Sequence, residues 1–264
     1  MTYKNHPPLH GVRTAPRKAY FLALATLAGL SPVVGQAQSW NGFSLGLDGG
    51  AIRSHVVYET GPDDQSWFKT TNETASMRAT GDHRDADYAA LLGLTLGYDH
   101  QTGPWVYGAE LGLNATQISL ATRNTYNYTN SARHYTYRQE ATCTGLHTLS
   151  ARAGYAFGPS LLSASAGLAV TRIRTSLDFV DDYAVQYASH GSEKGFWTGW
   201  TLGLGYRRRL ANGFALRANA SYVALGKDGL TSIIHAADGT SITGMNFASK
   251  VRLNTYTLGV EKRF

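Results

Sequence analysis

Eight stretches of this chain alternate apolar residues with small or polar ones, and this period of two constrains the fold more than any other feature. Successive side chains of a β-strand point to opposite sides, so each stretch predicts a strand with different surroundings on its two faces. We expect each strand to span about ten residues. The eight stretches are WNGFSLGLDGG (40–50), YAALLGLTLGYD (88–99), WVYGAELGLNA (105–115), LHTLSARAGYAF (146–157), LLSASAGLAV (161–170), GWTLGLGYRR (199–208), FALRANASYVAL (214–225) and LNTYTLGVEKRF (253–264).

The connections between these stretches alternate in length. HQTGP, GPS and LANG form three short turns of the residue types that favour tight turns. The other four connections are long and polar, covering about residues 52–87, 116–145, 173–195 and 227–250. Short turns at one rim and long loops at the other predict an all-β protein, an eight-stranded antiparallel up-and-down transmembrane β-barrel.

A soluble eight-stranded barrel of the lipocalin kind is the alternative, and it would hide its apolar face inside. Here the small and polar face is mostly Gly, Ser and Thr with a few charges, such as Glu110 and Arg152. The opposite face carries Leu, Ala and Val, with aromatic residues near the strand ends. An apolar band edged by aromatic residues favours lipid outside and a polar interior.

The N-terminus is typical of a secretory signal peptide. Arg13, Arg17 and Lys18 precede the apolar run AYFLALATLAGL, and small residues follow at Gly35 and Ala37. We therefore expect a signal peptide over residues 1–37 and a barrel domain over residues 38–264. The run is too short to span a bilayer as a helix, which needs about 20 residues.

Removing the signal peptide changes the charge balance. Residues 1–37 hold four of the 24 basic residues and none of the 18 acidic ones, so the formal net charge falls from +6 to +2. The basic character of the full chain is therefore no argument for nucleic-acid binding. The single cysteine, Cys143, excludes an intramolecular disulfide or a thiolate metal cluster.

These segments resemble a known family. WNGFSLGLDGG is similar to the opening strand of the small porin-family outer-membrane proteins, within the OmpA-like superfamily of eight-stranded barrels. GLTLGYDHQTGPWVYGAELGL resembles that family's second hairpin with its inward glutamate, here Glu110. LSARAGYAFGPSLLSASAGLAV and GWTLGLGYRRRLANGFALRANASYVALG resemble strands four to seven. The resemblance implies a location in the outer membrane of a Gram-negative bacterium.

The resemblance also gives the last strand a role. In such barrels a final strand with alternating apolar residues and a terminal phenylalanine is the signal that the outer-membrane assembly machinery reads. The matching positions here are Tyr256, Leu258, Val260 and Phe264. This chain departs from the pattern at Lys262, where an aromatic or aliphatic residue is usual; a lysine near the rim can snorkel to water. It also carries Arg207, Arg217 and Asn219 where relatives often have a glutamate.

Four charged residues of the polar face are expected to pair inside the barrel. Glu110 and Arg152 lie at similar distances from their turns on adjacent strands, as do Arg217 and Glu261. We predict an ion pair in each case, serving as charge compensation in a filled lumen or, alternatively, as an ion path. Exchanging the charges of Glu110 and Arg152 together should then restore what either single change loses.

Some small barrels modify lipid A, so an enzymatic role is a further alternative. The sequence HGSE supplies His190, Ser192 and Glu193, and the spacing puts the histidine and the serine on one face of a strand. Glu193 would point the other way, so the acid would have to come from elsewhere. A polar loop explains the motif as well, and we predict no enzymatic activity and no catalytic residues.

The second long loop is rich in tyrosine. His134 is surrounded by Tyr126, Tyr128, Tyr135 and Tyr137, and both residue types can ligate haem iron. Some relatives bind haem, so this segment resembles a possible acquisition site. Tyrosine-rich loops are also general contact surfaces, and no spacing here demands a metal. We therefore expect no cofactor and no metal site.

The sequence favours a structural, surface-exposed role in the cell envelope with contacts made through the long loops. A surface barrel that binds a ligand, such as haem or a host component, is the alternative, and a lipid A-modifying enzyme is the third reading. The expected partners are outer-membrane lipid and lipopolysaccharide, the assembly machinery during biogenesis, and a possible surface ligand. An eight-stranded barrel is narrow enough to be filled by its own side chains, which argues against a wide diffusion pore.

Overall fold

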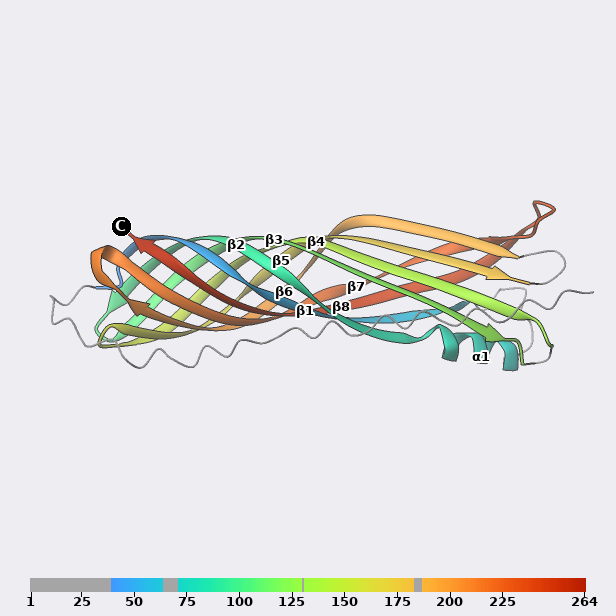
Figure 1. The fold of residues 1–264 in the computed structure, drawn as a ribbon, viewed down its shortest axis with the longest axis horizontal. Coiled ribbons are helices and arrows are strands. Elements are labelled where there is room, and N and C mark those ends of the chain that lie inside the picture. Colours follow the sequence, from blue (N-terminus) through green and yellow to red (C-terminus); the bar gives the residue numbers. More distant parts are fainter. Residues whose placement is uncertain (1–38, 64–70, 130, 183–186) are drawn as a thin grey trace, which may run out of the picture. The chain divides into compact units, whose positions relative to one another are not determined.

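A computed structural model describes residues 39–63, 71–129, 131–182 and 187–264. The predicted signal peptide lies outside the described residues. Eight antiparallel strands, each paired with the next along the chain, form a closed barrel, and the last strand pairs with the first (Figure 1). The elements are β1 (Gly42–Pro62), α1 (Thr71–Gly81), β2 (His83–Thr102), β3 (Trp105–Asn127), β4 (His134–Phe157), β5 (Ser160–Asp181), β6 (Ala188–Arg209), a 3-10 turn η1 (Ala211–Gly213), β7 (Phe214–His235) and β8 (Ser241–Arg263).

The predicted eight-stranded up-and-down barrel is confirmed, but the predicted strand length is wrong. The strands run for 20 to 24 residues rather than about ten. Three of the four expected long loops, 116–145, 173–195 and 227–250, are mostly strand, and the fourth, 52–87, also contains the helix α1. Among the described residues, no helix is long and apolar enough to cross a membrane.

The reason for this error is a reversal of the inside and outside patterns along the same strands. Near the end with the short turns, the outward side chains are apolar and the inward ones small or polar. On β1, Leu45 and Leu47 point outward and are about half exposed, whereas Ser44 and Asp48 are buried. Farther along β1, Ile52, Val56 and Tyr58 are buried. The alternation therefore continues, but its polarity is opposite to that of a lipid-facing strand.

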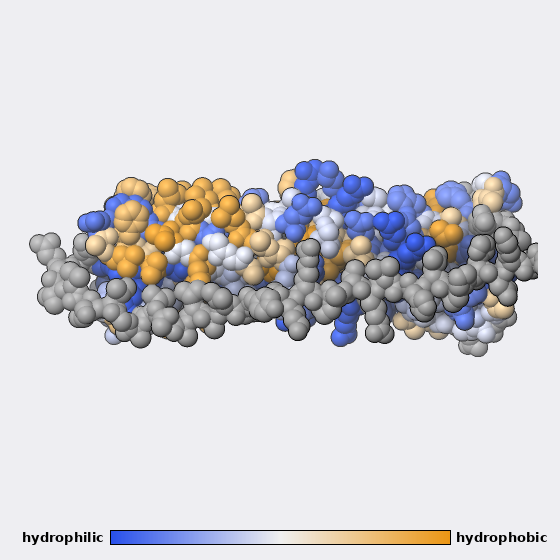
Figure 2. Space-filling model, in the orientation of Figure 1, coloured by the Kyte–Doolittle hydropathy of each residue, from blue (hydrophilic) through white to orange (hydrophobic). Residues whose placement is uncertain are grey.

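We call the first region the apolar band, because its outward surface is almost wholly hydrophobic. Figure 2 shows hydrophobic residues gathered over the end of the barrel that holds the chain's C-terminus, with hydrophilic residues over most of the rest of this face. Aromatic pairs lie at its edges: the ring centroids of Phe43 and Tyr98 are 4.9 Å apart, and those of Trp105 and Tyr155 5.4 Å. The outward apolar residues of the band include Phe43, Leu45, Leu47, Leu92, Leu94, Leu96, Tyr98, Leu111, Leu113, Leu149, Tyr155, Leu162, Leu168, Trp200, Leu202, Leu204, Tyr256, Leu258 and Val260.

We call the second region the distal half, and apolar side chains fill its interior. Tyr135, Tyr137 and Phe179 are almost fully buried and contact one another, with ring centroids 5.5 to 6.2 Å apart. Met77 of α1 is fully buried in the same core. Its backbone oxygen accepts a hydrogen bond from the Tyr137 hydroxyl, so the helix closes this end of the core. The distal half is thus built like a soluble barrel, with its hydrophobic core inside.

A bulge at Gly145 sets the facing on β4. The register with both neighbouring strands shifts here, between Asn114 and Gln117 on β3 and between Thr144 and His147 on β4. Gly145 has a φ of 69°, which glycine adopts without the steric cost that a Cβ brings. The extra residue moves the inward positions of β4 from odd to even numbers: Cys143 is buried before the bulge, and Leu146 after it.

The reversal predicts that the same substitution has different effects at two outward sites, one in the apolar band and one in the distal half. Leu94 in the apolar band and Val180 in the distal half are 46 % and 49 % exposed. Leu94→Lys should reduce the free energy of unfolding by about 2–4 kcal/mol, because a lysine there faces hydrocarbon. Val180→Lys should change it by less than about 0.5 kcal/mol, because that site faces water. Urea unfolding in phospholipid vesicles measures both, and equal losses at the two sites would contradict the assignment.

Candidate functional site

The interior of the apolar band holds four carboxylates and four guanidinium groups, which we call the ionic network. Every strand but β5 contributes to it, and the formal charges of the eight side chains cancel. The members are Asp48, Asp99, Glu110 and Glu261 with Arg152, Arg207, Arg217 and Arg263. All but Glu110 and Arg263, which are partly exposed, are buried. Because an isolated buried charge is very costly, only mutual neutralisation allows so many charges inside.

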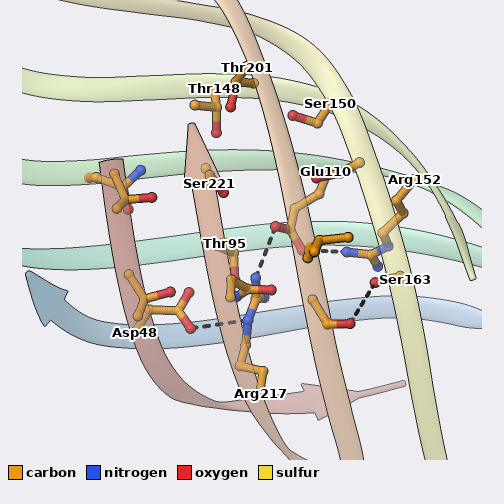
Figure 3. Close-up of a pocket in the computed structure, with 18 of the residues that line it drawn as sticks. Asp48, Thr95, Glu110, Thr148, Ser150, Arg152, Ser163, Thr201, Arg217 and Ser221 are labelled. Atoms are coloured by element: carbon orange, nitrogen blue, oxygen red, sulfur yellow. Dashed lines mark hydrogen bonds and ion pairs between the residues drawn. The ribbon is translucent and has the colours of Figure 1, made fainter. Parts of the chain in front are cut away.

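Glu110 is the hub of this network. One of its carboxylate oxygens accepts hydrogen bonds from Arg152 and from Arg207 Nη2, the latter at 2.9 Å. The other oxygen accepts from Arg217 Nη2 at 2.9 Å. Figure 3 shows Arg217 and Arg152 reaching this carboxylate from different strands. Glu110 is therefore shared by three guanidinium groups, of which only Arg152 stands on an adjacent strand.

Asp99 and Glu261 bind two of these arginines, and both also bind Arg263. Asp99 accepts two hydrogen bonds from Arg152, at 2.7 and 2.8 Å, and one from Arg263 at 2.9 Å. Glu261 lies 3.2 Å from Arg207 Nε and 3.0 Å from Arg263 Nη1. These contacts join β2, β4, β6 and β8 across the lumen, so the network cross-braces strands that are not neighbours in the sheet.

Both ion pairs predicted from the sequence are present, but each of the four residues also meets other partners. The structure brings Glu110 and Arg152 together, but in the shared arrangement just described. Arg217 and Glu261 are 3.6 Å apart, yet Arg217 lies closer to Asp48, at 3.1 Å, and to Glu110. Because Glu110 and Arg152 have these further partners, exchanging their charges is not expected to restore stability. An arginine at position 110 would face Arg207 and Arg217.

Small inward residues make room for these long side chains. A Cβ on Gly97 would lie 2.7 Å from Arg152 Nη2 and 2.8 Å from the Ser44 hydroxyl, so a larger residue would displace one of these side chains. The sequence indicates which further residues point into the lumen, because Asp48, Asp99 and Arg207 all fall on the polar side of the alternation. Facing alone does not tell which charges meet across the lumen.

Trp40 closes the interior of the barrel at the end with the short turns, next to the ionic network. It is 1 % exposed, and Arg209 and Arg263 stack on its ring with guanidinium carbons 4.1 and 5.1 Å from the centroid. Its backbone oxygen also accepts a hydrogen bond from Arg263. Its backbone N–H donates to Gln101 at 2.6 Å. The indole ring and its two arginines therefore cover the interior at this end.

A polar cavity of about 80 Å³ lies on the other side of the network. Its lining includes Glu110, Arg152 and Arg217, whereas Leu91, Leu146 and Val223 contribute apolar surface from the distal core. This volume accommodates a few water molecules among polar groups. The cavity is bounded by charge pairs on one side and by hydrophobic core on the other, so it is a chamber within the barrel rather than a channel along it.

The haem candidates do not converge on one point. Tyr135 and Tyr137 point into the distal core, and burial raises the pKa of Tyr137 well above its ordinary value. His134 points outward, with about half of its side chain exposed, and its Nδ1 lies 3.1 Å from an Asp182 carboxylate oxygen. The histidine and the tyrosines thus lie on opposite faces of β4. Among the described residues, no group of three or more His, Cys, Asp or Glu side chains is placed to hold a metal ion.

The HGSE motif lies on the outward surface of β6 in the distal half. His190 Nδ1 is 2.5 Å from Asp178 Oδ1 on β5, so the acid beside the histidine is Asp178 rather than Glu193. Ser192 is exposed two residues along the same face, opposite Ser176. Within the described part of the chain, no hydrogen bond joins His190 to Ser192. The histidine does not activate the serine in this arrangement.

The last strand presents the predicted assembly residues to the outside of the barrel. Tyr256, Leu258 and Val260 alternate on the outward face of β8, and Phe264 is 75 % exposed at its end. Lys262 shares that face, but its ammonium donates to the Asn212 backbone oxygen at 2.5 Å and lies 4.7 Å from the Phe214 ring centroid. The lysine thus turns its charge to the rim and leaves the apolar band intact.

The ionic network predicts that Glu110→Gln is far more damaging than loss of a surface carboxylate. The change leaves three buried guanidinium groups short of one negative charge, and we expect a loss of about 3–5 kcal/mol in the free energy of unfolding. Glu193→Gln, at an exposed position, should change it by less than about 0.5 kcal/mol. The double exchange Glu110→Arg with Arg152→Glu should be no more stable than either single variant. Urea titration in vesicles compares these five variants with the unchanged protein, and recovery in the double variant would contradict the shared arrangement.

Comparison with known proteins gives one family match. The sequence model described as "Outer membrane protein beta-barrel domain" matches residues 21–264. No curated protein gives a significant sequence match.

Three solved structures are similar in part, each over 85% of this chain. They are OprG from Pseudomonas aeruginosa (13% identity, 96% of that chain, TM-score 0.49), the outer membrane protease OmpT from Escherichia coli (9%, 97%, 0.45) and Ail, the attachment invasion locus protein of Yersinia pestis (12%, 99%, 0.36). The family match covers the whole barrel and confirms the resemblance and the location predicted from the sequence. The chain belongs to the outer-membrane β-barrel family.

Proposed function

We propose that this protein is a sealed, structural barrel of the outer membrane that presents its distal half at the cell surface for contacts, without catalysis. The observation that carries the proposal is that side chains close its interior at three levels, with a small polar cavity between two of them. Trp40 covers the turn end, the ionic network crosses the lumen, and Tyr137 and Phe179 fill the distal half. A barrel filled in this way stabilises itself but has no path for solutes.

The distal half supports the surface part of the proposal. Its strands continue well beyond the apolar band, so they extend past the bilayer on the side opposite the short turns. A hydrophobic core inside and polar residues outside give this extension a rigid frame that holds without lipid. The proposed contacts are with lipopolysaccharide around the barrel and with surface partners at its far end.

The last strand and the HGSE motif also support the proposal. The outward alternation of Tyr256, Leu258 and Val260, with Phe264 exposed at the end of the strand, supports recognition by the assembly machinery during biogenesis. The absence of a hydrogen bond between His190 and Ser192 in the described structure supports a role without catalysis. The proposal includes no nucleic-acid partner.

The test of a sealed barrel is conductance in a planar lipid bilayer. The purified, folded protein should give no discrete current steps, because charge pairs and core side chains fill its lumen. A large-lumen porin at the same protein-to-lipid ratio serves as the positive control. Heat-dependent mobility on a gel shows that the inserted protein is folded. Reproducible steps from the folded protein would contradict the proposal.

A further inference from the structure

Three basic side chains form a compact patch on the outward surface of β5 and β6. Arg172 and Arg174 point outward from β5, and Lys194 points outward from β6. The register places Arg174 directly opposite Lys194, and Arg172 directly opposite Phe196. We call these three residues the cationic patch.

The patch is electrostatically unsatisfied by the protein itself. Like charges placed directly opposite each other on neighbouring strands destabilise a sheet. Within the described ranges, no hydrogen bond or ion pair joins any of the three side chains to another residue. The nearest carboxylates in the register, Glu193 opposite Thr175 and Glu140 opposite Ser176, stand farther from the apolar band than the patch. Asp178 lies farther still and contacts His190. An anion from outside the chain would offset this repulsion.

The position of the patch indicates what kind of anion that is. Arg172 is the first outward residue of β5 beyond Val170, where the apolar band ends. On the band side of the patch, Phe196 is 74 % exposed and Leu168 68 %. A ligand that contacts both surfaces has an anionic head group directly above hydrocarbon chains. This is the chemistry of a phosphorylated lipid held at the membrane surface.

We infer that the cationic patch binds a phosphate group of lipopolysaccharide in the outer leaflet. Arginine donates paired N–H groups that match phosphate oxygens, and lysine adds a compact charge opposite. The exposed Phe196 and Leu168 contact the acyl chains of the same lipid. The inference rests on the proposed function, because it needs the distal half to emerge from the leaflet that contains lipopolysaccharide.

Native mass spectrometry of the full, folded chain in detergent tests this directly. The probe is bisphosphorylated lipid A, compared with the same lipid after removal of its phosphates. The phosphorylated form should bind more tightly by about tenfold or more, and the triple variant Arg172→Gln, Arg174→Gln, Lys194→Gln should lose that preference. The single variant Arg174→Gln should lose part of it.

A matched control removes three exposed arginines elsewhere. Arg84→Gln, Arg123→Gln and Arg138→Gln together change the net charge equally but lie farther from the apolar band, and this protein should bind lipid A as the unchanged chain does. Heat-dependent gel mobility shows that each variant is folded. Equal binding of both lipid forms, or equal losses in both triple variants, would overturn the inference.

A competition experiment distinguishes binding of the lipid from binding of free phosphate. Millimolar inorganic phosphate should leave lipid A bound, and full displacement would overturn the lipid assignment. Failure of these binding tests leaves the proposed sealed barrel standing. Failure of the proposed function would instead appear as conductance of the folded protein.

Discussion

Closure of the sheet is the constraint on which the rest of this structure depends. In hydrocarbon no water satisfies a free strand edge, so every backbone N–H and C=O of the apolar band must pair within the protein. The chain meets this requirement by pairing β8 with β1 from Ser44 to Pro62. Eight strands enclose a narrow lumen, and side chains must then fill it. The ionic network and the distal core are two different solutions to that one packing problem.

The two solutions follow from what surrounds each half. Where lipid is outside, the apolar residues face outward, and the interior is left to polar groups that must neutralise one another. Glu110 with three guanidinium groups does this at the level of the band. Where water is outside, the hydrophobic effect returns the apolar residues to the interior, as at Ile52 and Phe179. At this boundary the outward surface turns from apolar to basic, which is where the cationic patch lies.

Much of the barrel could be predicted from period-two alternation and turn chemistry, which together give the strand count, the order and the inward face. The distal strands could not, because their pattern is reversed and, on β4, shifted by the bulge at Gly145. The contacts between charges inside the lumen could likewise be predicted only in part. Glu110 and Arg152 are neighbours in the sheet and could be paired from the sequence. Arg207 and Glu110 meet across the lumen from β6 and β3, and no spacing along the chain records that contact.

The central claim is that one continuous strand passes from lipid to water while its outward and inward patterns exchange. Spin labels at Ala164, Leu168, Ser176 and Val180, all outward positions of β5, measure this directly in a Cys143→Ser background reconstituted in vesicles. Accessibility to oxygen, which concentrates in lipid, should be high at the first two positions and low at the last two. Accessibility to a water-soluble nickel complex should show the opposite order. Lipid exposure that continues to Val180, or water exposure already at Leu168, would contradict the account.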